Sequence, residues 1–335
     1  MATPSMKLSV DALAEGLVGG NRSMLARAIT LVESNRPDHE VLGQALITRL
    51  LPRTGGATRI GITGVPGVGK SAFIEAFGGL LTTAGHRVAV LSIDPSSVRT
   101  GGSILGDKAR MMKLSADPKA FIRPSPSGSV LGGIARKTRE TMLLCEAAGY
   151  DIVLIETVGV GQSEVAVASM TDLLLVLMLA GAGDELQGIK RGLLERADMI
   201  VVTKADGRNV TAASIAASQY RFAMNLLHEA AELPEVVTCS AVEGTGLDRI
   251  WTLITDRMGG AERSGALKAK RAEQATAWMW TLVDEKIRET LRQTEAIRTI
   301  AENAEQQVRG GTMTPVLGAG AIVDALRLSG VKPAG

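Results

Sequence analysis

The chain has 335 residues, a formal net charge of +2 and only 3% aromatic residues. This length allows one large α/β domain with additions, and the near-neutral charge gives no electrostatic reason to expect nucleic acid or a membrane surface as a partner. The two cysteines lie far apart in the sequence and the first residues lack a basic, apolar secretory leader, so we expect a cytoplasmic protein without a disulfide framework.

The first part of the chain, residues 1–56, predicts a helical N-terminal segment. MLARAITLVES follows Asn21, a residue type that commonly caps helices, and HEVLGQALITRLL follows Pro37 and Asp38. Both stretches repeat apolar residues at helical spacing, which indicates short amphipathic helices.

Residues 57–258 alternate short apolar runs with helical patterns. The runs are TRIGIT, RVAVLSID, DIVLIET, LLLVLML, MIVVTK and EVVTCS, with FIRP near residue 122 as one more. Strands separated by helices predict an α/β fold with a doubly wound, mostly parallel sheet. The most apolar run, LLLVLMLA, is too short to cross a bilayer, so we interpret it as a buried strand.

A phosphate-binding loop connects the first of these strands to the following helix. The stretch GVPGVGKS fits the pattern G-x-x-x-x-G-K-[ST], whose glycines let backbone N–H groups point toward an anion. The alternative is a glycine-rich turn, but the flanking strand and helix favour a P-loop NTPase fold. The predicted phosphate contacts are Gly64, Val65, Pro66, Gly67, Val68, Gly69, Lys70, Ser71 and Ala72. Lys70 is expected to reach the phosphates during catalysis, and the Ser71 hydroxyl to bind Mg²⁺.

Carboxylates at the ends of two other strands predict the remainder of a magnesium site. Glu156 ends DIVLIET and Asp94 ends RVAVLSID, and we expect both to take part in catalysis and metal binding. Asp107 lies beyond them and is a third candidate ligand. Helix capping for Asp94 and a solvated surface position for Asp107 are the alternatives. Gly159 is placed to sense the γ-phosphate through its N–H.

Guanine recognition is predicted after MIVVTK. Thr203, Lys204 and Asp206 form the pattern [NT]-K-x-D at the carboxyl end of a strand, where ligands bind in open α/β sheets. The Asp206 carboxylate can accept hydrogen bonds from guanine N1–H and the 2-amino group together, an arrangement that adenine lacks. Ser240 and Ala241 follow another strand, where backbone N–H groups can donate to guanine O6.

One expected catalytic part is missing from this pattern. Ras-like switches place a water-orienting Gln directly after the glycine that senses the γ-phosphate. Here Val160 follows Gly159, and the nearest glutamine is Gln162. We therefore expect slow unaided hydrolysis and a partner that completes the site.

The remaining residues, 259–335, predict a helical C-terminal arm. The chain from 262 to 308 is charged, and no glycine occurs between Gly265 and Gly310. We interpret it as an arm for dimerisation, with a helix folded back on the sheet as the alternative. TPVLGAGAIVDALRLSG predicts a last helix.

GVPGVGKS, DPSS, ETVGVGQSE and TKAD, in this order, resemble the SIMIBI class of P-loop GTPases and most closely its MeaB/ArgK family, to which human MMAA is related. The resemblance covers nearly the whole chain. It implies a homodimeric GTPase, binding GTP or GDP with Mg²⁺, that acts as a chaperone of methylmalonyl-CoA mutase during adenosylcobalamin loading. It also implies a mobile loop within AGAGDELQGIKR, where Gln187 and Lys190 would relay mutase binding.

Two other functions remain open on the residues alone. Related GTPases insert nickel or other metals, but they usually carry clustered His or Cys ligands, and the three histidines of this chain are scattered. A metabolic kinase with the same fold is the second alternative, although a guanine-selective loop argues against it. For AGAGDELQGIKR, a solvated connection is the alternative to a coupling role.

Overall fold

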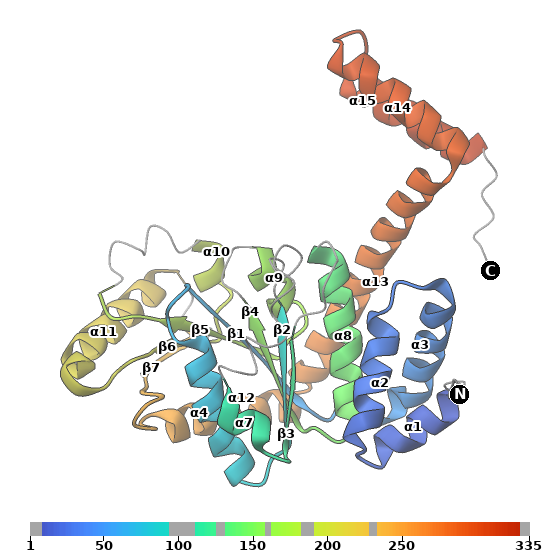
Figure 1. Cartoon of the computed structure of the whole chain (residues 1–335). Coiled ribbons are helices and arrows are strands. Elements are labelled where there is room, and N and C mark those ends of the chain that lie inside the picture. Colours follow the sequence, from blue (N-terminus) through green and yellow to red (C-terminus); the bar gives the residue numbers. More distant parts are fainter. Residues whose placement is uncertain are drawn as a thin grey trace. The chain divides into compact units, whose positions relative to one another are not determined.

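The computed structural model describes residues 9–93, 111–124, 131–157, 162–181, 191–227 and 233–328 (Figure 1). Within this part of the chain, seven strands form a sheet in the order β3-β2-β4-β1-β5-β6-β7, and every neighbouring pair is parallel. The strands are β1 Thr58–Gly64, β2 Val88–Ile93, β3 Ala120–Arg123, β4 Ile152–Thr157, β5 Leu173–Met178, β6 Met199–Val202 and β7 Glu235–Thr238. The predicted doubly wound α/β fold is confirmed, and each predicted run contains one strand.

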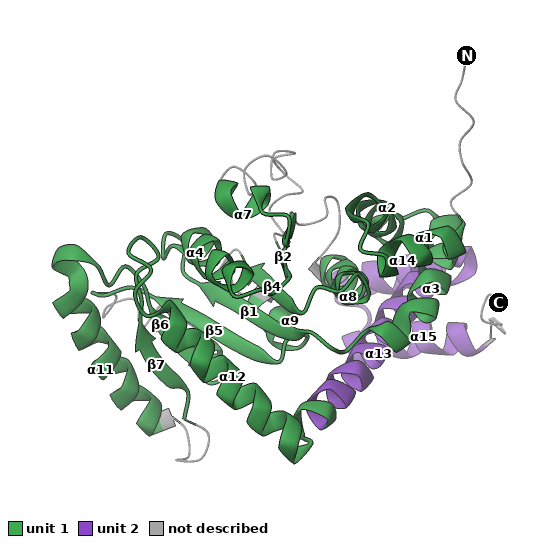
Figure 2. Cartoon of the chain, turned by 90° about the horizontal axis from the view of Figure 1, so that it is seen from below, with its two compact units in different colours: residues 1–268 green, residues 269–335 purple. Residues whose placement is uncertain are grey.

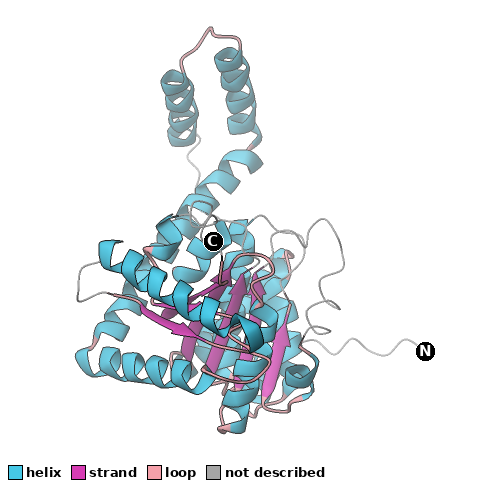
Figure 3. Cartoon of the chain, turned by 90° about the vertical axis from the view of Figure 1, so that its left-hand side faces the viewer, coloured by secondary structure: helices cyan, strands magenta, loops and turns pink. Residues whose placement is uncertain are grey.

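Helices cover both faces of the sheet (Figure 3). On one face, β1 side chains such as Ile60 and Ile62 share a buried cluster with the helices α4 Lys70–Thr83, α7 Met112–Ala116 and α12 Leu247–Ser264. On the other face, a second buried cluster includes side chains of α8 Leu131–Ala147, α9 Gln162–Ala168 and α11 Val210–Leu227. Shorter elements are η1 Leu51–Arg53, α10 Arg191–Leu194 and η3 Gly207–Asn209. Burial on both faces explains why the strands have continuous apolar sequences.

Glycine sets the distance between α9 and β1. A Cβ atom at Gly61 would lie 2.5 Å from Val167 Cγ1 and 3.0 Å from Thr171 Oγ1. Val167 is in α9, so only a residue without a side chain at Gly61 lets the helix lie this close to the central strand.

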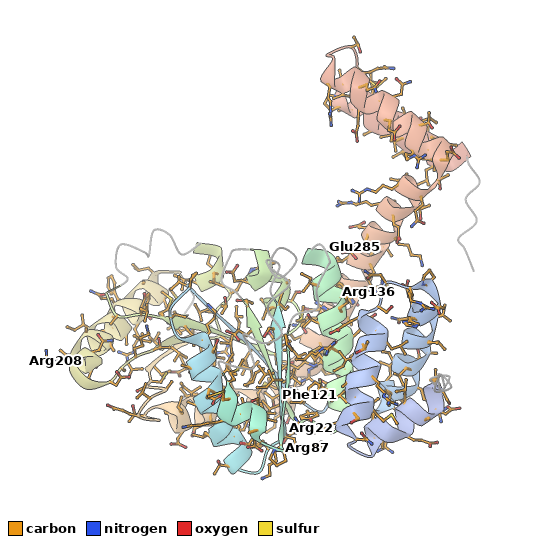
Figure 4. The ribbon with its side chains drawn as sticks, in the orientation of Figure 1. Arg22, Arg87, Phe121, Arg136, Arg208 and Glu285 are labelled. Atoms are coloured by element: carbon orange, nitrogen blue, oxygen red, sulfur yellow. The ribbon has the colours of Figure 1, made fainter. Side chains whose placement is uncertain are left out.

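Three N-terminal helices pack against α8. They are α1 Val10–Val18, α2 Arg22–Glu33 and α3 Pro37–Leu50, and Asn21 caps α2 by accepting from the N–H groups of Ser23 and Met24. Arg136 of α8, labelled in Figure 4, donates to Glu40 at 2.6 Å. Arg59 of β1 donates to the buried Glu146 of α8 at 2.6 Å. The N-terminal helices therefore belong to the same compact unit as the sheet.

The C-terminal boundary differs from the expected one. The chain divides into compact units of residues 1–268 and 269–335, coloured separately in Figure 2. The boundary expected at residue 258 falls inside α12, because the helix continues through Gly259 and Gly260. It ends at Gly265, which adopts a left-handed conformation with φ 78°. This is the usual conformation of a glycine that terminates a helix.

The residues after Gly265 form three helices. They are α13 Ala266–Gln293, α14 Glu295–Arg309 and α15 Pro315–Leu328. The predicted charged helical segment is interrupted between α13 and α14, where Thr294 has extended backbone angles. The α14 and α15 helices lie side by side as a hairpin, and a Cβ at Gly318 would lie 3.2 Å from Val308 Cγ2.

Both cysteines of the chain are buried and unbonded. Burial raises the pKa of the Cys145 thiol, with a smaller contribution from the charge of Glu146. Burial also raises the pKa of Cys239 to about 12. In the described part of the chain, no helix is both long enough and apolar enough to cross a membrane.

Candidate nucleotide-binding site

The loop between β1 and α4 has the backbone geometry of a phosphate cradle. Gly64, Gly67 and Gly69 have φ values of 153°, 79° and 97°, which side chains rarely allow. A Cβ at Gly64 would also lie 2.5 Å from the carbonyl oxygen of Leu177 in β5. At Gly67 a Cβ would meet nothing within 4 Å, so this side of the loop is open. The two glycines that the sequence pattern requires, Gly64 and Gly69, thus both have backbone angles that favour glycine.

Lys70 begins α4 directly after the cradle. Its side chain is only 9% exposed, and Nζ donates to the carbonyls of Gly64 at 2.7 Å and Val65 at 3.2 Å. Burial lowers the pKa of this ammonium, whereas the carboxylates of Glu156 and Glu164 act in the opposite direction. A desolvated cation held by the loop is suited to bind a phosphate group, because its charge is poorly screened there.

Ser71 and Glu156 meet at the carboxyl edge of the sheet. Ser71 Oγ donates to Glu156 Oε1 at 3.3 Å, and both side chains are half-buried. A hydroxyl and a carboxylate are the hard oxygen ligands that Mg²⁺ prefers. These two residues therefore fit a magnesium ion, which would neutralise phosphate charge when bound.

The loop after β6 is attached to the phosphate loop by two hydrogen bonds. Thr203 Oγ1 donates to the Val68 carbonyl at 2.7 Å, and Lys204 Nζ donates to the Gly67 carbonyl at 2.9 Å. Lys204 is the one non-glycine residue in the described part with a positive φ, at 57°. The strained backbone supports a special role for this residue. Through these contacts, the loop after β6 braces the phosphate loop.

Asp206 and Ser240 come together from two neighbouring strand ends. Ser240 Oγ donates to Asp206 Oδ2 at 2.6 Å, and the N–H of Glu243 donates to Ser240 Oγ at 3.1 Å. The Ala205 N–H donates to the Cys239 carbonyl at 3.0 Å, which aligns the two loops. The Asp206 carboxylate is half-buried and held on one side by a hydroxyl. Ala241 follows at the same strand end and is half-buried.

The sequence profile of the family described as methylmalonyl-CoA mutase-associated GTPase MeaB matches residues 25–296. The chain belongs to the MeaB family. As a member of it, the protein is a P-loop GTPase, an enzyme that hydrolyses GTP to GDP and phosphate.

MeaB-family relatives cover most of the chain. A Caulobacter vibrioides protein whose name describes a GTPase is 54% identical over 306 residues, covering 91% of this chain and 94% of the relative. The mitochondrial methylmalonic aciduria type A homolog of Mus musculus is 45% identical over 330 residues, covering 95% and 80%. A crystal structure of a LAO/AO transport system kinase is 38% identical, with a TM-score of 0.77 and coverage of 96% and 98%.

Several predicted site residues of this MeaB-family chain lie outside the described residues. They are Asp94, Asp107 and Gly159, together with the coupling residues Gln187 and Lys190. Their predicted roles stay predictions.

Two carboxylates with contacts in the structure were not singled out by the sequence patterns. Glu164, in the first turn of α9, is 8% exposed and its charge acts on Lys70. Glu75 of α4 accepts from the N–H groups of Lys113 at 2.8 Å and Leu114 at 3.4 Å, so it caps α7. Glu164 occurs in the stretch ETVGVGQSE, and its place after a strand end was an available signal. Nothing in the local sequence indicates the contact of Glu75.

Proposed function

We propose that this MeaB-family GTPase is a chaperone of an adenosylcobalamin-dependent methylmalonyl-CoA mutase, and that its GTP state controls loading and protection of the mutase cofactor. The observation that carries the proposal is the match of residues 25–296 to a family described as mutase-associated. The name of the mouse relative, a methylmalonic aciduria type A homolog, supports the same proposal.

The site residues have distinct roles in this proposal. Lys70 leaves the Gly64 and Val65 carbonyls to bind phosphate oxygens and stabilises the charge that develops on the transferred group. Backbone N–H groups of the loop from Gly64 to Ala72 hold the remaining phosphate oxygens. Ser71 and Glu156, with Asp94 and Asp107, would hold Mg²⁺, whose charge offsets that of the phosphates.

Base selection follows from the second loop. Asp206 accepts from guanine, and the Ser240 hydroxyl keeps its carboxylate in one orientation. Lys204 and Thr203 connect this loop to the phosphate loop. The N–H of Ser240, predicted as a donor to guanine O6, instead donates to the Thr245 carbonyl at 3.0 Å, so we assign that donor role to the N–H of Ala241. The two hydrogen bonds to Gly67 and Val68 make base binding and phosphate binding parts of one site.

Coupling to the mutase is proposed for the loop that carries Gln187 and Lys190. Loss of the γ-phosphate releases the Gly159 N–H, and the loops that change with it alter the fit to the mutase. Whether GTP or GDP is bound would then determine how the protein binds the mutase. Slow unaided hydrolysis is expected, because no glutamine directly follows Gly159.

The C-terminal helices are proposed to form a homodimer. Along α13, Trp280, Val283 and Ile287 are exposed apolar side chains at helical spacing, and Met279 lies beside them. Exposed apolar stripes of this kind commonly mark a protein interface. Sedimentation of the whole chain over a range of concentrations tests this part of the proposal.

GTP turnover with and without saturating mutase, loaded or not loaded with adenosylcobalamin, tests the central proposal. The mutase is expected to accelerate turnover, and Gln187→Ala and Lys190→Ala should reduce the acceleration while leaving unaided turnover intact. Acceleration by a small-molecule phosphate acceptor instead of the mutase would favour a kinase, the activity in the name of the structural relative. Absence of any effect of the mutase would contradict the chaperone role.

A further inference from the structure

Ser92 lies at the carboxyl end of β2, on the sheet face that α4 covers. Its strand neighbours Val88 and Val90 point to the same face and belong to the buried cluster that includes α4. The Ser92 side chain is 7% exposed. Ser92 is therefore a polar residue on a face of β2 where the two preceding residues are valines.

The hydroxyl of Ser92 has no hydrogen-bond partner within the part of the chain that the structure describes. Among the serines and threonines that the structure describes, it is the one whose buried side-chain oxygen makes no hydrogen bond. Other buried hydroxyls of the sheet are paired, as in the bond from Thr157 Oγ1 to Thr63 Oγ1 at 2.9 Å. Burying an unpaired hydroxyl lowers the stability of the ligand-free chain. The Ser92 hydroxyl is therefore a candidate to form a hydrogen bond once ligands are bound.

Glu156 is the neighbour of Ser92 in the sheet. The two residues are directly aligned in the parallel pairing of β2 with β4. Neighbouring strands lie about 4.8 Å apart, and aligned side chains project from the same face. Glu156 Oε1 already accepts from Ser71 Oγ at 3.3 Å. A carboxylate has room for further donors, because its two oxygens offer about four acceptor positions.

We propose that Ser92 is a positioning residue of the nucleotide site, whose hydroxyl donates to the Glu156 carboxylate when Mg²⁺ and nucleotide are bound. This inference rests on the proposed role of Glu156 in holding the metal. Groups that hydrogen-bond a ligating carboxylate fix its orientation, and losing one typically weakens metal binding about 10- to 100-fold. Ser71 and Ser92 would then hold Glu156 from α4 and from β2.

The test is a Mg²⁺ titration of the binding of fluorescent GDP to the whole chain. In Ser92→Ala, the Mg²⁺ concentration that gives half of the full gain in GDP affinity should rise about tenfold, while metal-free affinity stays unchanged. Ser92→Thr keeps the hydroxyl and should restore the wild-type titration. Thermal unfolding of the ligand-free Ser92→Ala chain should occur at the wild-type temperature or above it, because no hydrogen bond is lost.

Thr138→Val is the matched control. Thr138 is a buried hydroxyl of α8 that donates to the Ile134 carbonyl at 2.9 Å, so its loss should lower the unfolding temperature and leave the Mg²⁺ titration unchanged. Coinciding titrations of Ser92→Ala and wild type would overturn the inference, as would a lower unfolding temperature for Ser92→Ala. If wild-type binding itself showed no response to Mg²⁺, the metal assignment in the proposed function would fail, which is a separate result.

Discussion

Thr203 and Val68 connect the two halves of the nucleotide site directly. Thr203 Oγ1 donates to the Val68 carbonyl at 2.7 Å and lies 3.2 Å from the Met178 carbonyl as well. The side chain is buried, so this hydroxyl is part of the internal structure of the site. A base-recognition loop held in this way cannot move independently of the phosphate loop.

Replacing Thr203 by Val should remove a hydrogen bond between the base-recognition loop and the phosphate loop and so lower the stability of the chain. The variant keeps the shape of the side chain but leaves the Val68 carbonyl without this donor, whereas the Met178 carbonyl still accepts from the backbone N–H of residue 203 at 2.8 Å. The free energy of unfolding should therefore fall by about 1–3 kcal/mol. Denaturant unfolding measures this change. Thr211→Val, at an exposed position of α11, is the control and should leave stability almost unchanged. Equal stability of both variants would show that the Thr203 contact is energetically unimportant.

Gly64→Ala tests the packing of the phosphate loop against β5. The new Cβ would lie 2.5 Å from the Leu177 carbonyl oxygen, so the backbone has to shift and nucleotide binding should be lost, with destabilisation of more than about 1 kcal/mol. Gly55→Ala is matched, because φ is also positive at 87° but no atom lies within 4 Å of the added Cβ. It should cost only about 1 kcal/mol, from backbone strain. Circular dichroism melting curves and GDP binding distinguish the two.

Lys70→Ala should nearly abolish turnover. Removing the ammonium takes away a charge-stabilising donor to the phosphates, and such losses lower the rate about 100- to 1,000-fold. The fold should survive, because the hydrogen bonds of Lys70 Nζ go to the carbonyls of Gly64 and Val65, only a few residues away in the chain, and do not join distant elements. Phosphate release from GTP measures the effect. Turnover equal to wild type would remove Lys70 from the reaction.

Asp206→Asn should move base preference from GTP toward XTP. Xanthine has a carbonyl where guanine has its 2-amino group, and the asparagine amide supplies the donor that this carbonyl requires. Competition between GTP and XTP for binding reports the change. Ser240→Ala, which removes the hydroxyl 2.6 Å from Asp206, should weaken guanine preference without creating a preference for xanthine. A variant that prefers GTP by the wild-type margin would refute the role of Asp206.

Lys137 predicts a pH dependence of stability away from the nucleotide site. Burial lowers the pKa of this ammonium, which donates to Asn35 Oδ1 at 2.7 Å. Just below its usual pKa of about 10.4, the unfolded chain therefore binds more protons than the folded chain, and stability rises with pH. Lys137→Met lacks this rise, so the stability of wild type relative to the variant should increase through that window. Urea unfolding at several alkaline pH values checks it, and parallel curves would contradict it.

The sequence predicted the strands well because the sheet is buried on both faces. Runs such as IVLI and LLLVLM are apolar at successive positions, unlike an exposed amphipathic helix. The glycines of the phosphate loop were predictable for a different reason, since their backbone angles exclude side chains. In both cases, the constraint lies within a few neighbouring residues.

Contacts between distant segments were not predictable in the same way. Gly259 and Gly260 suggest a helix end, yet α12 continues through them, because glycine only weakens a helix and tertiary packing compensates. The capping of α7 by Glu75 joins positions about forty residues apart, and Ser92 appears significant only once its strand register with Glu156 is known. No local pattern carries this information.

The burial of both cysteines has a practical consequence for observing this GTPase. A thiol reacts with maleimides and mild oxidants as its thiolate, and burial, which raises the pKa of both Cys145 and Cys239, disfavours that form and keeps reagents away. A cysteine introduced at Val242, which is 88% exposed and two residues after Ser240, would therefore react selectively. The two native cysteines therefore need not be replaced before a single dye is attached beside the guanine-recognition loop. Such a dye would allow nucleotide exchange to be followed in real time.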